Sequence, residues 1–145
     1  MKYARKSHGF TLVELLIVVI VIAILAAISV VAYSGAQQRG RDAVRTHDIA
    51  TLQRAIESYN VMNGTYPGVC PGGNGSGCDV SNLATALVPD IIAKVPNDPQ
   101  YPYHAYNYVR GSATSYGLYV THYETKPPCK VGVNMFAGWW GAPTC

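Results

Sequence analysis

The sequence predicts an α+β fold in which one long N-terminal helix packs on a small antiparallel β-sheet. Three observations predict it. Residues 15–33 form an apolar run, apolar side chains then recur at helical spacing, and the C-terminal third is rich in Tyr, Val and Thr between Gly and Pro clusters. The length of 145 residues fits one domain, so helix and sheet are expected to belong together.

The first half of the predicted helix, residues 10–33, is long and apolar enough to cross a membrane. The run 15–33, interrupted by Ser29, would measure about 28 Å as a helix, close to the thickness of a bilayer core. Lys2, Arg5 and Lys6 precede it in the leader, residues 1–9. Because positive charges stay on the cytoplasmic side, we expect a single pass through the cytoplasmic membrane with an extracytoplasmic head.

Glu14 is the unusual residue of this segment, a single carboxylate at the start of a hydrocarbon helix. A charge at the bilayer centre costs about 2.5–3.5 kcal/mol on insertion scales, so it needs a cationic partner. Cleavage after Gly9 would create one, the new amino terminus on Phe10. An ordinary signal peptide or an uncleaved signal anchor would explain the apolar run but leaves Glu14 without a role.

The second half, residues 34–62, is predicted to be amphipathic and to end at Asn63-Gly64. Its apolar stripe consists of Ile49, Leu52, Ala55, Ile56 and Tyr59. The spacing indicates one helix face, which we expect to pack on the head. Polar residues on the opposite face are Arg45, Asp48, Arg54 and Glu57.

Three arginines, Arg39, Arg41 and Arg45, begin this amphipathic half. We interpret them as a solvated collar. Contact with anionic lipid headgroups, or with acidic groups of neighbouring subunits, is the alternative.

The head, residues 63–145, is predicted to hold a short helix and an antiparallel sheet of three or four strands. Ser81 is the expected N-cap of a helix over residues 82–88, which ends at Pro89. Strands are expected at residues 103–110, 115–123 and 130–135. The many tyrosines between residues 101 and 123 suit half-buried strands with their hydroxyls in water.

Four cysteines lie in the extracytoplasmic part: Cys70, Cys78, Cys129 and Cys145. An even number in a small extracytoplasmic domain indicates two disulfides, and three pairings are allowed. We favour Cys70–Cys78 and Cys129–Cys145, because each closes a short local loop. Neither pair has the CxxC spacing of a zinc site.

The composition gives no sign of an enzyme or of a nucleic-acid-binding protein. The chain has 11 Lys and Arg against 8 Asp and Glu, and loss of the three leader cations would balance the side-chain charges. His47, His104 and His122 are scattered without a nucleophile or metalloprotease motif. We therefore predict no catalytic residues, no metal and no specific nucleic acid.

Residues 6–15, KSHGFTLVEL in one-letter code, resemble the class III signal peptide of type IV prepilins and type II secretion pseudopilins. The helix end, Asn63-Gly64 followed by Tyr66-Pro67, is similar to the same proteins, so the resemblance covers about the first half of the chain. It implies a pilin-like fold and cleavage between Gly9 and Phe10 by a prepilin peptidase. Phe10 would then be N-methylated, and Glu14 would pair with its amine on a neighbouring subunit.

The function that this resemblance implies is a structural subunit of a type IV pilus-like filament, held in the membrane before assembly and extracellular afterwards. The alternatives are a major pseudopilin of type II secretion and a membrane-anchored extracytoplasmic binding module. Expected partners are identical or related subunits, the peptidase and methylase, an assembly ATPase and an inner-membrane platform protein. No cofactor is expected. Since related pseudopilins bind calcium, a calcium site around Asn97 and Asp98 is the alternative.

Overall fold

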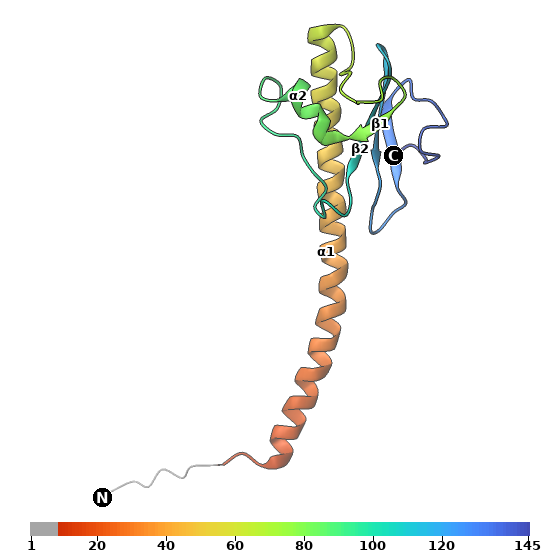
Figure 1. Ribbon diagram of the computed structural model, residues 1–145. Coiled ribbons are helices and arrows are strands. Elements are labelled where there is room, and N and C mark those ends of the chain that lie inside the picture. Colours follow the sequence, from red (N-terminus) through yellow and green to blue (C-terminus); the bar gives the residue numbers. More distant parts are fainter. Residues whose placement is uncertain (1–8) are drawn as a thin grey trace, which may run out of the picture. The chain divides into compact units, whose positions relative to one another are not determined.

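A computed structural model of the protein describes residues 9–145. The leader residues Lys2, Arg5 and Lys6, and with them the predicted orientation signal, lie outside the described residues. The chain divides into two compact units, the first ending at Gln37 and the second beginning at Gln38. The expected α+β class is confirmed, with one long helix and one small antiparallel sheet (Figure 1).

Helix α1 runs without interruption from Leu12 to Asn63, close to the predicted bounds. It ends where the sequence indicated, because Gly64 adopts a left-handed conformation with φ of 69°. The Gly64 N–H donates to the Asn60 carbonyl at 2.8 Å. A glycine in this conformation after the last turn satisfies an otherwise unpaired carbonyl and stops the helix.

The sheet has four antiparallel strands in the order β1-β2-β3-β4. They are β1 (Gly77–Asp79), β2 (Tyr106–Ser112), β3 (Ser115–Val120) and β4 (Cys129–Val133). The three predicted strands are present, each displaced or shortened by a few residues. The short strand β1 was predicted as part of a loop, because three residues with a glycine carry no alternating pattern.

The predicted short helix is divided in two, a 3-10 turn η1 (Val80–Leu83) and one α-turn α2 (Ala84–Leu87). Its N-cap is Asp79, so the prediction of Ser81 was wrong. The Asp79 side chain accepts a hydrogen bond from the Ser81 N–H at 2.7 Å. Both residues are good cap formers. Asp79 is the cap because strand β1 ends at this residue and η1 begins directly after it.

The core lies between the second half of α1 and one face of the sheet. Its fully buried side chains include Leu52, Ile56, Leu83, Tyr106, Tyr108, Tyr116 and Leu118. Three of the tyrosines are therefore interior residues and not half-buried ones. The Tyr106 hydroxyl donates to Asp48 at 3.0 Å and the Tyr108 hydroxyl to the Pro67 carbonyl at 2.8 Å, which replaces the expected contact with water.

Candidate functional site

The predicted processing site lies immediately before α1. Gly9 and Phe10 are in irregular, exposed chain, and 87% of the Phe10 surface is accessible. A Cβ atom placed on Gly9 would meet nothing within 4 Å, so the fold itself does not demand glycine there. The need for glycine, and the cleavage itself, remain predictions from the resemblance.

Glu14 takes part in a capping box at the start of α1. The backbone N–H and the hydroxyl of Thr11 each donate to Glu14 Oε2 at 2.8 Å, and the Glu14 N–H donates back to Thr11 Oγ1 at 3.2 Å. This reciprocal arrangement satisfies N–H groups that have no partner within the helix. The pattern Thr-x-x-Glu is the signal in the sequence from which this cap could have been predicted.

The part of α1 between Leu12 and Tyr33 presents apolar side chains on all sides. The exposed large apolar residues in it include Leu12, Leu15, Leu16, Ile17, Ile20, Ile24, Leu25, Ile28 and Val31. Among the residues described, α1 is the one helix long and apolar enough to cross a membrane, with a mean hydropathy of 3.4 over its most apolar window. Residues 12–33 would span about 33 Å, slightly more than a bilayer core.

Arg45, which was predicted to be solvated, is fully buried within the second unit and has an exposed fraction of 0%. Its guanidinium donates to both carboxylate oxygens of Asp98, at 2.8 and 3.1 Å. Further bonds reach Asp42 at 2.8 Å, Glu124 at 3.2 Å and the amide oxygen of Gln100 at 2.8 Å. A guanidinium has five N–H donors, and here each has an acceptor. We call Arg45 and these four acceptor residues the Arg45 cluster.

The solvated-collar interpretation is also wrong for Arg41, and it fits only Arg39, which is exposed. Arg41 binds Glu124 through two nitrogens, with Nη2 at 2.6 Å from Oε2. The reason lies in the helix period. Arg45 is four residues before Ile49 and seven before Leu52, so it shares the buried face of α1. Its charge alone had predicted exposure to solvent.

Two carboxylates of the Arg45 cluster, those of Asp42 and Glu124, are held in their ionised form. Burial would raise the pKa of Asp42, but hydrogen bonds from Thr125, from the Glu124 N–H and from Arg45 hold it well below its ordinary value. The Arg41 hydrogen bond lowers the pKa of Glu124 to about 2. Asp48, whose carboxylate accepts only from Tyr106 in the described residues, has a pKa raised by burial.

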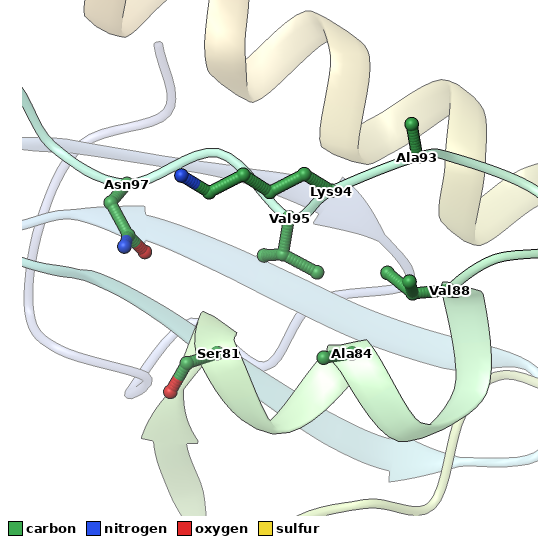
Figure 2. A pocket seen from close by; sticks show the side chains of 7 residues that line it. All are labelled: Ser81, Ala84, Val88, Ala93, Lys94, Val95 and Asn97. Atoms are coloured by element: carbon green, nitrogen blue, oxygen red, sulfur yellow. The ribbon is translucent and has the colours of Figure 1, made fainter.

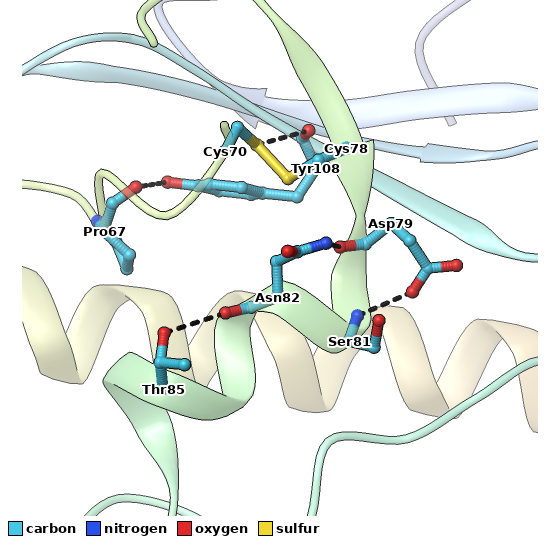
Figure 3. The surroundings of a disulfide bond; sticks show 8 residues. All are labelled: Pro67, Cys70, Cys78, Asp79, Ser81, Asn82, Thr85 and Tyr108. Carbon is cyan, nitrogen blue, oxygen red and sulfur yellow. Dashed lines mark hydrogen bonds between the residues drawn. A yellow bond between two sulfur atoms is a disulfide. The ribbon is translucent and has the colours of Figure 1, made fainter. Parts of the chain in front are cut away.

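Both disulfides of the favoured pairing are present, Cys70–Cys78 and Cys129–Cys145. Figure 3 shows the first one beside strand β1, with Cys70 Sγ 3.5 Å from the Tyr108 carbonyl oxygen. Further bonds in the same view join Thr85 to the Asn82 carbonyl and Asn82 to the Asp79 carbonyl. The disulfide thus ties the loop after α1 to the segment that carries the first strand and η1.

The second disulfide holds the C-terminal segment against β4. The Lys130 N–H donates to the Pro143 carbonyl and the Cys145 N–H to the Lys130 carbonyl, both at 2.9 Å. The buried Lys130 ammonium donates to the carbonyls of Ala137 and Trp139, both at 2.8 Å. These contacts of Lys130 were not predicted, because no local sequence pattern marks a lysine whose ammonium donates to backbone carbonyls.

The remaining candidate residues form no chemical site. His104 and His122 stack with ring centroids 4.1 Å apart, and among residues 9–145 no three His, Cys, Asp or Glu side chains gather in a way that could hold a metal. Asn97 lies on the rim of a shallow cavity of about 250 Å³, shown in Figure 2, whereas Asp98 belongs to the Arg45 cluster. The calcium alternative at Asn97 and Asp98 stays a prediction.

Comparison with known proteins finds one family model and several relatives, each of which matches part of the chain. A family model described as the prokaryotic N-terminal methylation motif matches residues 4–30. The chain is 36% identical over 67 residues to the type II secretion system core protein G of Vibrio cholerae, covering 46% of each chain. It is 40% identical over 62 residues to the type IV wide pilus major component PilA4 of Thermus thermophilus, covering 43% of this chain and 47% of the relative.

A longer match, 27% identical over 101 residues, is to the core protein G of Dickeya chrysanthemi, and it covers 66% of this chain and 64% of the relative. The chain spans somewhat less than half the length of the first relatives it matches. No solved structure matches it. By its methylation motif and these relatives, the chain is similar to type IV pilins and type II secretion pseudopilins, and its long helix and small antiparallel sheet fit that resemblance.

Proposed function

We propose that the chain is the structural subunit of a type IV pilus-like filament that assembles through residues 10–33. The observation that carries the proposal is the part of α1 between Leu12 and Tyr33, which is apolar on every face and has one carboxylate in its first turn. Such a helix is stable only in lipid or among other apolar helices. A filament core of like helices would supply the second environment once the subunit leaves the membrane.

Processing would prepare the helix for its transfer from the membrane to the filament core. Cleavage between Gly9 and Phe10 removes the cationic leader and creates an amine, which would be methylated on Phe10. The Glu14 carboxylate of the next subunit would pair with this amine. Burying either charge alone is unfavourable and burying both together restores most of the loss, so the pair fixes the register of subunits more than it adds stability.

The proposal implies a defined set of partners and two locations. Before assembly the subunit would cross the cytoplasmic membrane once with its head outside, and afterwards it would lie in an extracellular filament. A prepilin peptidase and methylase would process it. An assembly ATPase and an inner-membrane platform protein would move it into the fibre together with identical or related subunits.

The second candidate function is that of a major pseudopilin in type II secretion. It is favoured by the relatives named core protein G, which match a share of the chain similar to that matched by the pilus component. Electron microscopy of material sheared from cells distinguishes the two. Long surface fibres that contain this chain support the pilus, and their absence at normal expression supports the pseudopilus.

The filament proposal is tested by Glu14→Ala, with Ser29→Ala as a control for a polar residue of the same apolar segment. We expect the Glu14 variant to reach the membrane and to fail to appear in the sheared filament fraction, while the control assembles. A membrane-anchored binding module would be displayed normally by both. Mass spectrometry of the native subunit should find N-methylated Phe10 as its first residue, and a leader still attached would contradict the proposal.

A further inference from the structure

The sheet face that points away from α1 carries a row of positions with little or no side chain. Gly77, Val109, Gly117 and Gly132 are direct neighbours across β1, β2, β3 and β4 in the strand register. We call these four residues the glycine row. Side chains alternate along a strand, so Val109 faces away from the core that contains Tyr108. Val109 is nevertheless only 1% exposed, so another part of the chain buries it.

The C-terminal segment lies on this face. We call residues 134–145 the C-terminal strap. A Cβ atom placed on Gly117 would lie 3.1 Å from the indoles of both Trp139 and Trp140. One placed on Gly77, two strands away, would lie 3.8 Å from Trp140. Glycine at these positions therefore lets the two indoles approach the sheet closely.

The strap holds a backbone conformation that its sequence does not favour. Asn134 and Trp140 are left-handed, with φ of 47° and 56°, and Gly141 follows with 58°. A residue with a Cβ atom disfavours this region and stays there only where its surroundings impose it. The strap also lies outside the regular helices and strands. Its shape thus depends on the contacts that hold it to the sheet.

Two kinds of contact hold the strap in place. The ammonium of Lys130, a buried residue of β4, donates to the carbonyls of Ala137 and Trp139, both at 2.8 Å. The disulfide Cys129–Cys145 fixes the far end of the strap to the first residue of β4. The first contact is made of hydrogen bonds that open and close freely, whereas the second is a covalent bond with two redox states.

We propose that the C-terminal strap is a redox-sensitive latch, which lies on the glycine row while Cys129–Cys145 is closed and leaves the row when this bond is reduced. An external dithiol would reduce it by thiol–disulfide exchange. The dithiol gives up two electrons and two protons and becomes a disulfide, and the chain is left with two thiols. A disulfide donor closes the latch by the reverse reaction.

The accessibility of the two disulfides favours attack at the strap. Cys145 is exposed, whereas Cys70 is buried and Cys78 is half-buried. An attacking thiolate must reach a sulfur atom, so Cys129–Cys145 should be reduced before Cys70–Cys78.

The loss of the bond is large enough to release the strap. A disulfide that closes a loop of 16 residues favours the closed state by about a hundredfold on the chain-entropy model. Without it, the contacts of Lys130 and of the indoles must outweigh both the left-handed residues and the entropy of ordering the strap. This latch belongs to the second unit alone and does not depend on filament formation.

Fluorescence reports the position of the strap directly, because Trp139 and Trp140 are the two tryptophans of the whole sequence. The full chain in detergent micelles is measured with and without dithiothreitol, and mass spectrometry of labelled thiols shows which bond has opened. Reduction of Cys129–Cys145 should shift the emission to longer wavelength and raise the acrylamide quenching constant at least about threefold, since docking weakens by about a hundredfold. Amide hydrogen exchange should stay slow in β2 and β3 and become fast in the strap.

Two variants test the seat of the indoles and the trigger separately. Gly117→Val places a side chain under both indoles, so it should give the emission of the reduced chain while the disulfide is closed. Valine is a good strand former, so β3 should persist. Its control, Ala113→Val, adds the same kind of bulk in the exposed turn between β2 and β3 and should leave the emission unchanged. The double variant Cys129→Ser, Cys145→Ser should match the reduced chain and be indifferent to dithiothreitol.

Three results would overturn the proposal. Indoles that stay shielded after Cys129–Cys145 is opened would show that the strap holds without the bond. Fast exchange in β2 and β3 together with the strap, in the reduced chain or in the double serine variant, would show that the bond supports the whole head and releases no separate part. Shielded indoles in Gly117→Val would show that the glycine row is not their seat.

Discussion

Replacement of Thr11 by valine separates the two roles that Glu14 can have. The change removes the hydroxyl that binds the Glu14 carboxylate and receives the Glu14 N–H, while it leaves the size of the side chain and the charge of Glu14 unchanged. If Glu14 serves assembly by pairing with the Phe10 amine of a neighbour, the variant should still assemble. If Glu14 serves only to cap the helix, the variant should behave like one that has lost Glu14.

The magnitudes make the two outcomes easy to distinguish. Loss of an N-cap hydroxyl costs about 0.5–2 kcal/mol, and about 1 kcal/mol changes an equilibrium roughly fivefold. Removal of one partner of a buried charge pair costs about 3–5 kcal/mol, which corresponds to about two to four powers of ten. We therefore expect Thr11→Val to reduce filament yield severalfold, and by no more than about thirtyfold, and Glu14→Gln to reduce it at least a hundredfold.

The assay is a quantitative immunoblot of sheared filaments and of the membrane fraction from the same cells. Thr11→Ser keeps the hydroxyl and should match the native yield. Equal loss of filaments in Thr11→Val and Glu14→Gln, with normal amounts of both in the membrane, would refute the pairing argument in favour of helix capping.

Three further predictions concern the second compact unit, which begins at Gln38. Leu52→Ala should reduce its free energy of unfolding by about 2–5 kcal/mol in urea, because a fully buried side chain leaves a cavity. Gly132→Ala should reduce it by about 1–3 kcal/mol or more, because the new Cβ would lie 2.2 Å from the Tyr116 carbonyl oxygen. Stability should fall as the pH drops from 4.5 towards 2, because the pKa of Glu124 is lowered to about 2 from an ordinary 4.5 and its contribution exists only while the native carboxylate stays ionised. In Glu124→Gln the unfolding constant should rise less over this pH range than in the native chain, by a factor of up to about 100.

Each of these has a matched control on the same chain. Val61→Ala, at a side chain that is 84% exposed, should change stability by less than about 0.5 kcal/mol. Gly138→Ala, where an added Cβ meets nothing within 4 Å, should be tolerated. The exposed Asp90 replaced by Asn should leave the acid decline as it is. Controls as damaging as the test variants, or an unchanged slope in Glu124→Gln, would contradict the packing and charge arguments.

Features with a long period or a strong local signal could be predicted from the sequence. The apolar run, the stripe from Ile49 to Tyr59 and the stop at Gly64 give α1 almost to the residue, because each rests on the helical repeat or on the conformation of one glycine. The three tyrosine- and valine-rich strands follow from composition. The disulfides of the favoured pairing follow from the short distance along the chain.

Features that depend on contacts between distant segments could not be predicted. Arg45 lies 53 residues from Asp98, and nothing near either residue in the sequence indicates the other. The same holds for Lys130 and its carbonyl partners, and for β1, which is a strand only because Cys78 pairs with Tyr108. Polar residues are usually exposed, and this rule fails where ion pairs are fully satisfied inside the second unit.

The pairing of residues 143–145 with β4 affects how readily closely packed heads aggregate. β4 is one edge of the sheet, and residues 143–145 occupy backbone groups on it that a foreign strand would otherwise use. The other edge, β1, is only three residues long. Open strand edges invite uncontrolled aggregation, so heads packed at high density gain protection from this cover. Reduction of Cys129–Cys145 would loosen the cover, and adhesion between neighbouring sheets would then begin at β4.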